Sequence, residues 1–113
     1  MSIALLHSRA TLGIRAVPVR VEIHLGPGLP GFTMVGLPDT AVRESKDRVR
    51  SALINGGFRI PQQRITVNLA PADLPKDGGR FDLPIAVGIL LASGQLGRVE
   101  LKDMEWIGEL ALS

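Results

Sequence analysis

The feature that most constrains this fold is one stretch, residues 64–86, whose character changes twice along its length. Apolar and polar side chains alternate over residues 65–69, and this period of two predicts a β-strand. A loop rich in proline and glycine follows, and residues 83–92 then carry no charge. The uncharged run predicts a buried helix, with Asp82 as its N-cap residue and Pro84 in its first turn.

The loop inside this stretch has two interpretations. A strand, a glycine-bearing loop and a helix N-terminus in this order often form an anion or reaction site, because free backbone N–H groups converge there. Alternatively, Gly78 and Gly79 only allow a tight turn. The local pattern leaves both interpretations open.

Further strands are predicted on both sides of this stretch. The clearest covers residues 17–25, where apolar side chains alternate strictly with polar residues and Pro18. His24 falls on the solvent-facing side of that strand, which predicts a solvated surface residue. The other predicted strands lie at residues 3–8, continued at 12–14 beyond a turn, at 32–35 and at 104–113.

A second helix is predicted to begin at Asp39, its N-cap residue, and to end at the glycine pair 56–57. An apolar stripe at helical spacing marks the side that faces the core. Its members are Val42, Ser45, Val49, Ala52 and Leu53.

The opposite face of this helix is charged. The pairs Arg43–Asp47 and Glu44–Arg48 have i,i+4 spacing, which favours a solvated and self-neutralising surface. A phosphate-binding face is the alternative interpretation. It would use Arg43, Lys46 and Arg50.

Strands with two interspersed helices predict an α+β fold, in which a mixed sheet carries two helices on one face. The last strand, 104–113, would place Trp106 and Leu110 on its inner face. It ends without a closing element, so we expect residues 1–113 to form one domain that is truncated at its C-terminus. An unprotected edge of this kind predicts self-association.

Composition excludes several classes of function. The chain has no cysteine, which removes disulfides, thiolate metal sites and a cysteine nucleophile, and its two histidines lack the neighbours of a metal site. No apolar run has the length of about 18 residues that a membrane span needs, and the N-terminus lacks a secretory pattern. A cytoplasmic location is expected. The net charge of +2 is uneven, with 11 basic and 6 acidic residues in 1–81 against 2 and 5 in 82–113.

Two long blocks, residues 31–53 and 67–86, resemble the signature of the Mg-chelatase-like proteins, the family that includes the bacterial competence protein ComM. The resemblance extends from about residue 3 to residue 112. It implies a Lon protease-like fold, shared with domain 2 of ribosomal protein S5. It also implies that this is the N-terminal domain of a protein with an AAA+ ATPase module downstream.

For the whole protein, the resemblance implies a hexameric motor that uses ATP and Mg and acts on DNA, with branch migration during natural transformation as its role. A magnesium chelatase-type ATPase subunit is the alternative. No cofactor is expected in this chain itself, because no P-loop pattern for a nucleotide triphosphate occurs in it.

Lon-type proteases carry their nucleophilic serine in a loop of the pattern Pro-Lys-Asp-Gly-x-Ser-Ala-Gly. Residues 75–78 match its first four positions, but Arg80 stands where the serine would be. A guanidinium stays protonated and cannot act as the nucleophile. We therefore expect no catalytic residue in this chain.

Two classes of function remain open. As a binding module, the chain would offer Lys76, Arg80 and the basic helix face to DNA phosphates. As a structural module, it would assemble or orient the motor through apolar surfaces. Arg80 also has a structural alternative, in which it pairs with Asp77 or Asp82 to close the loop.

Overall fold

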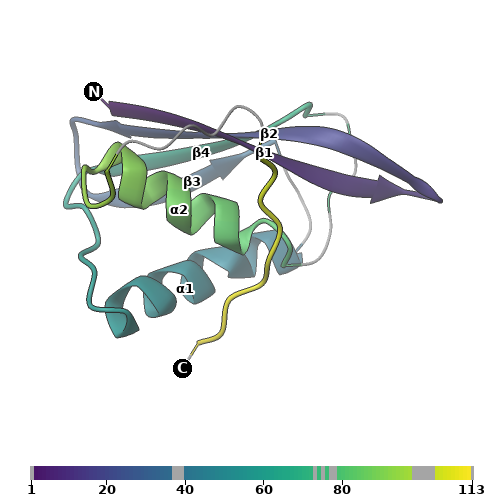
Figure 1. The fold of residues 1–113 in the computed structure, drawn as a ribbon. Helices are drawn as coiled ribbons and strands as arrows, with labels where there is room; N and C mark the ends of the chain where they lie inside the picture. Colours follow the sequence, from purple (N-terminus) through teal and green to yellow (C-terminus); the bar gives the residue numbers. More distant parts are fainter. Residues whose placement is uncertain are drawn as a thin grey trace.

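A four-stranded sheet and two helices make up the part of the chain that this computed structural model describes, which is residues 2–36, 40–72, 74, 76, 79–97 and 104–112 (Figure 1). The side chains of residues 40–43 are not described. In chain order the elements are β1 (Ser2–Leu12), β2 (Arg15–Gly26), β3 (Gly31–Val35), α1 (Thr40–Asn55), β4 (Arg64–Ala70) and α2 (Asp82–Ala92).

The sheet has the strand order β1-β2-β4-β3. The β1–β2 and β2–β4 pairs are antiparallel, whereas β3 and β4 run parallel, so the predicted mixed sheet is confirmed. The expected break within the first strand is wrong. β1 continues to Leu12, which pairs with Arg15, and the turn falls at Gly13 and Ile14.

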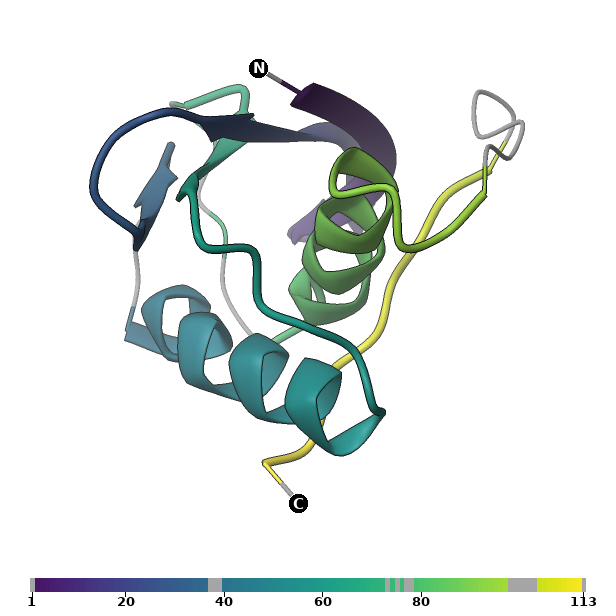
Figure 2. The same cartoon turned by 90° about the vertical axis from the view of Figure 1, so that its left-hand side faces the viewer.

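Both helices cover the same face of the sheet, as Figures 1 and 2 show. Along β1, β2 and β4, buried positions alternate with more exposed ones, and the buried side chains face the helices. The predicted apolar stripe of α1 is confirmed where it is described, since Ser45, Val49 and Leu53 are buried and Ala52 is half-buried. The side chain of Val42 lies outside the described residues.

Helix α2 lies against β1 and β2 at very short range because of Gly88. A Cβ atom at this position would lie 2.9 Å from Leu6 Cδ1 and still closer to Ile23 Cγ1. Helix α2, which is uncharged after Asp82, is buried at seven of its eleven positions, as the composition of residues 83–92 predicts. None of the helices in the described ranges is long and apolar enough to cross a membrane.

The predicted last strand is wrong. Residues 104–112, here named the 104–112 segment, form no regular secondary structure. One backbone hydrogen bond, from Trp106 N to His7 O at 2.8 Å, joins the segment to the edge of β1. The chain then leaves that edge because its next backbone bonds go to the start of α2, where Gly108 N donates to Arg80 O and Leu83 N donates to Gly108 O.

The inward side chains of this segment nevertheless pack as expected. Trp106 and Leu110 lie against the core, whereas Leu112 is exposed. The narrower expectations of a Lon protease-like fold, related to domain 2 of ribosomal protein S5, and of C-terminal truncation stay predictions.

Candidate functional site

Asp82 begins helix α2, but it does not cap it. Phe81 is the N-cap residue, and no side-chain cap hydrogen bond is present there. The predicted cap is therefore wrong, and the reason is visible in the carboxylate's partners. Asp82 accepts hydrogen bonds from the Ser45 hydroxyl, from Arg48 Nε at 2.7 Å and from Leu110 N at 3.0 Å. The other predicted cap, Asp39, lies outside the described residues.

Asp82 binds the side chains of Ser45 and Arg48, and these three residues are here named the Asp82 cluster. Its ion pair joins Asp82 to the partly buried Arg48. Asp82 is fully buried, and a buried charge is tolerated only with compensating partners. Its hydrogen bond to Arg48 raises the pKa of that guanidinium above its ordinary value. The predicted Glu44–Arg48 pair is confirmed at 3.8 Å, on the outer side of the cluster.

The cluster joins three segments that are distant in sequence, namely α1, α2 and the 104–112 segment. It has little capacity for catalysis. Ser45 is buried and its hydroxyl already donates to Asp82, while Arg48 cannot take up a proton. The arrangement is that of a structural connection. Sequence reasoning missed it because Arg48 and Asp82 are 34 residues apart.

Lys76 has a different environment from the one expected of a phosphate contact. Only 3% of the residue is exposed, and its ammonium donates to the carbonyl oxygens of Gly36 at 2.7 Å, Leu74 at 3.0 Å and Pro71. In this position Lys76 ties the loop after β4 to the end of β3. Its role as a DNA ligand stays a prediction, and the arrangement seen here does not present the ammonium to solvent.

Arg80, at the position of the Lon-type nucleophile, is half-buried, and its carbonyl accepts from Gly108 N. The alternative prediction is that the Arg80 side chain pairs with Asp77 or Asp82. It is not seen at Asp82, because that carboxylate pairs with Arg48, and Asp77 lies outside the described residues. Neighbouring Gly79 is buried against the 104–112 segment, because a Cβ there would lie 2.7 Å from the Glu109 side chain. Close packing as well as turn geometry therefore explains this glycine.

The predicted basic face of α1 is divided between two environments. Lys46 donates to Phe32 O at 3.0 Å, on the outer edge of β3, so it protects that strand edge. Arg50 is exposed and lines a groove. The side chain of Arg43 lies outside the described residues. These predicted residues share no common contact surface in the described structure.

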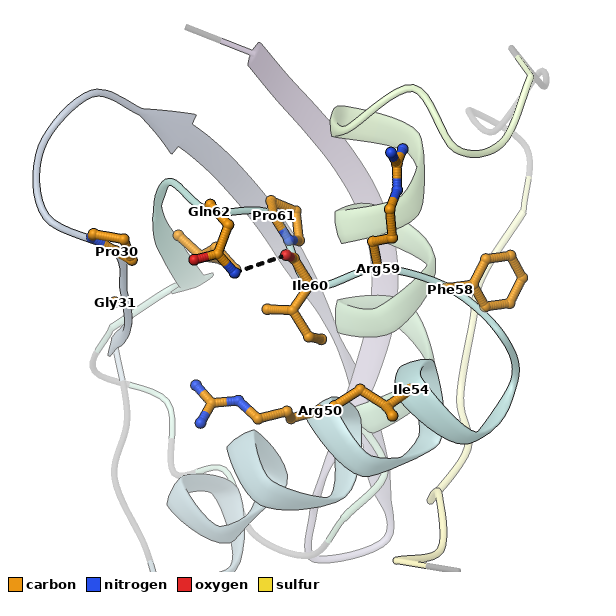
Figure 3. Close-up of a pocket in the computed structure, with 10 residues that line it drawn as sticks. Pro30, Gly31, Arg50, Ile54, Phe58, Arg59, Ile60, Pro61 and Gln62 are labelled. Carbon is orange, nitrogen blue, oxygen red and sulfur yellow. Dashed lines mark hydrogen bonds between the residues drawn. The ribbon is translucent and has the colours of Figure 1, made fainter.

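The groove lies between α1, the start of β3 and the segment that leads into β4 (Figure 3). Its volume is about 650 Å³. Figure 3 shows Arg50 extended from α1 with its guanidinium toward Pro30 and Gly31, whereas Arg59 points away from it. The remaining lining residues are Ile54, Phe58, Ile60, Pro61, Gln62 and Ile65.

Two amide side chains hold the wall of this groove. Gln95 accepts from Arg59 N and donates to Arg59 O, both at 2.9 Å, and Gln62 donates to Ile60 O at 3.4 Å. The lining residues that the structure describes are largely apolar, with two arginines and no acidic residue among them. Such a groove suits an apolar ligand surface that bears a carboxylate. Sequence reasoning identified Arg50 but missed the groove, which depends on three separate segments.

The structure thus defines a small α+β domain with an open, largely apolar groove, and comparison with known proteins identifies its family. The model of the family described as "Subunit ChlI of Mg-chelatase" matches residues 21–113, and the chain belongs to that family. It is 61% identical over 113 residues to the competence protein ComM of Haemophilus influenzae. It is 59% identical over the same length to the protein YifB of Salmonella typhimurium and 58% identical to YifB of Escherichia coli.

Each of these alignments covers 100% of this chain and 22% of the relative. The chain therefore spans about a fifth of the length of these proteins. The predicted membership of the Mg-chelatase-like family is confirmed.

Proposed function

We propose that this chain is a non-catalytic domain of a ComM-like AAA+ ATPase, which helps to assemble the motor and contacts DNA in an auxiliary way. The observation that carries the proposal is the largely apolar, arginine-bearing groove, because an open surface of this kind suits a protein partner. Hexameric assembly and a role in natural transformation belong to the same proposal. The printed name of the Haemophilus relative, a competence protein, supports the latter.

Three features support the non-catalytic part. Arg80 replaces the nucleophile, the sequence contains no P-loop, and Ser45 is buried with its hydroxyl bound to Asp82. ATP and Mg would then bind outside this chain, which spans about a fifth of the length of its relatives. The description of the family favours the alternative of a magnesium chelatase-type ATPase subunit.

For the auxiliary DNA contact, the available residues are fewer than the sequence predicts. Lys46 and Lys76 donate to backbone carbonyls, whereas Arg50 and Arg80 form no ion pair with any residue that the structure describes. Of the predicted DNA ligands whose side chains are described, only these two arginines are left to contact phosphates, so binding through them would be weak and without sequence preference. A pure protein-interaction module without DNA contact is the remaining alternative.

Two measurements test this proposal. Incubating the chain with ATP and with a serine-directed phosphonate should give neither phosphate release nor labelling, and stoichiometric labelling of any serine would overturn the non-catalytic role. Sedimentation should show mass that increases with protein concentration. A monomer at every concentration up to about millimolar, where even weak pairing with a free energy near −4 kcal/mol becomes visible, would overturn the assembly role.

A further inference from the structure

We propose that the groove beside Arg50 receives the 104–112 segment of a second copy of this chain, so that copies associate head to tail. This inference rests on the proposed assembly role and gives it a specific contact. It combines two surfaces of the same molecule, a basic apolar groove and an acidic apolar segment.

The groove is the basic member of the pair. Ile54, Ile60 and Ile65 give it apolar walls, and Arg50 and Arg59 are the charged residues among its described lining. Neither guanidinium forms an ion pair with a residue in the described ranges. An occupant that brings a carboxylate would satisfy this charge and bury the apolar walls at the same time.

The 104–112 segment has the complementary chemistry. It contains two acidic residues and no basic one. Glu105 pairs with Arg9 at 2.6 Å, but the Glu109 side chain is 65% exposed and only approaches Arg48 at 3.9 Å. Ile107 and Leu112 are 53% and 62% exposed, so apolar side chains flank this exposed carboxylate.

This segment can meet a second molecule without leaving its own. Its inward residues, Trp106 and Leu110, pack on the core, and Leu110 N is held by Asp82. Its outward residues make up the surface that remains for a partner. The contact therefore requires no exchange of segments between copies.

The two surfaces are built from different parts of the molecule. The groove includes Gly31 at the start of β3, whereas Trp106 is bonded to β1, and these strands are the two edges of the sheet. Figure 2 shows this segment beginning on the flank away from β3 and ending beside α1, where Asn55 Nδ2 donates to Leu112 O at 3.3 Å. A contact between two different surfaces of one molecule is heterologous, and repeated contacts of this kind give rings or filaments rather than closed dimers.

Charge reversal tests this contact on the 113-residue chain. The variants Arg50→Glu and Glu109→Lys should each self-associate at least about tenfold more weakly than the wild type in sedimentation, because like charges would face each other. An equimolar mixture of the two should recover association. Every groove in the mixture then has a complementary segment available on the other variant.

Three controls make the result specific. Arg20→Glu reverses an exposed charge on β2, outside the groove lining, and should leave association unchanged. Glu109→Gln removes the carboxylate without placing a cation near Arg48, and it should also weaken association. Unfolding midpoints should show that each variant is folded.

The outcomes separate this inference from the assembly role. If the wild type associates and Arg50→Glu associates equally well, the groove contact is wrong and the assembly role survives. If both reversals weaken association but their mixture does not recover it, the partner is not the 104–112 segment. A wild type that stays monomeric at every concentration overturns both.

Discussion

Two buried charged residues, Lys76 and Asp82, are stabilised in different ways. Asp82 has a guanidinium, a hydroxyl and a backbone N–H as partners, whereas Lys76 is surrounded by carbonyl oxygens. In both cases the charge connects segments that are distant in sequence, since Asp82 joins α1 to α2 and Lys76 joins the loop after β4 to the end of β3. Removing either charge should therefore lower the free energy of unfolding, because its partners would be left without their counterpart.

Replacing Asp82 with Asn tests the Asp82 cluster. The change keeps the side-chain volume but leaves Arg48 without its buried counter-charge, so we expect a loss of about 3–5 kcal/mol in the free energy of unfolding. Urea denaturation measures it. Glu44→Gln is the matched control, because Glu44 is an exposed partner of the same guanidinium and should contribute less than about 0.5 kcal/mol. A loss below about 1 kcal/mol for Asp82→Asn would contradict the structural role of the cluster.

The pH dependence of this contact follows from Arg48. Its pKa is raised in the folded state, so its contribution is complete below the ordinary arginine pKa and is lost only as pH rises through the higher folded value. The stability difference between the wild type and Arg48→Met should consequently stay constant from about pH 6 to about pH 10. Denaturation at several pH values checks this. A difference that shrinks within that range would show that the guanidinium is not the important partner.

At the scale of whole elements, the packing of α2 on the sheet depends on Gly88. Gly88→Ala increases intrinsic helix propensity by about 1 kcal/mol, but its methyl group meets Ile23 and Leu6. We expect the steric cost to exceed the gain in helix propensity, with a net loss of about 1–3 kcal/mol in the free energy of unfolding. Thermal and urea unfolding measure the sum.

A double-mutant cycle identifies the cause. In an Ile23→Ala background the added methyl group has room, so Gly88→Ala should cost less there than in the wild type. Equal costs in both backgrounds would exclude the contact with Ile23 as the origin of the effect.

Most of these elements could be predicted from the sequence because periodicity is a local signal. The alternation in β2 and β4 and the apolar stripe of α1 each lie within one segment. The 104–112 segment was mistaken for a strand because its partners, Arg80 and Asp82, belong to the start of α2. Its course is set by long-range bonds that no local pattern contains.

The candidate site was predictable to a smaller extent for the same reason. The loop motif identified Lys76 as a free cation, but one of its carbonyl partners, Gly36, lies 40 residues earlier in the chain, at the end of β3. Arg50 was found from helical spacing alone, and the structure places it in the groove. The groove walls come from β3, α1 and the segment before β4, so only the fold brings them together.

For the whole molecule, electrostatics favours modest rather than strong attraction to DNA. The net charge is only +2, and the two lysines proposed as ligands donate to backbone carbonyls. Among the predicted ligands whose side chains are described, phosphate contacts would therefore come mainly from Arg50 and Arg80, with an added contribution from the α2 N-terminus next to Arg80. A site of this size gives weak binding with a shallow salt dependence.

The double variant Arg50→Ala/Arg80→Ala measures this contribution. Removing up to two phosphate contacts should flatten the slope of log affinity against log salt by up to about two units, since each contact releases roughly one counterion. The fold should survive, because neither side chain forms an ion pair within the described part of the chain. Lys76→Ala is the contrasting variant, and it should lower the unfolding temperature, because it leaves buried carbonyls without their donor. An unchanged salt slope in a stable double variant would end the phosphate-binding interpretation and leave the groove as a site for protein alone.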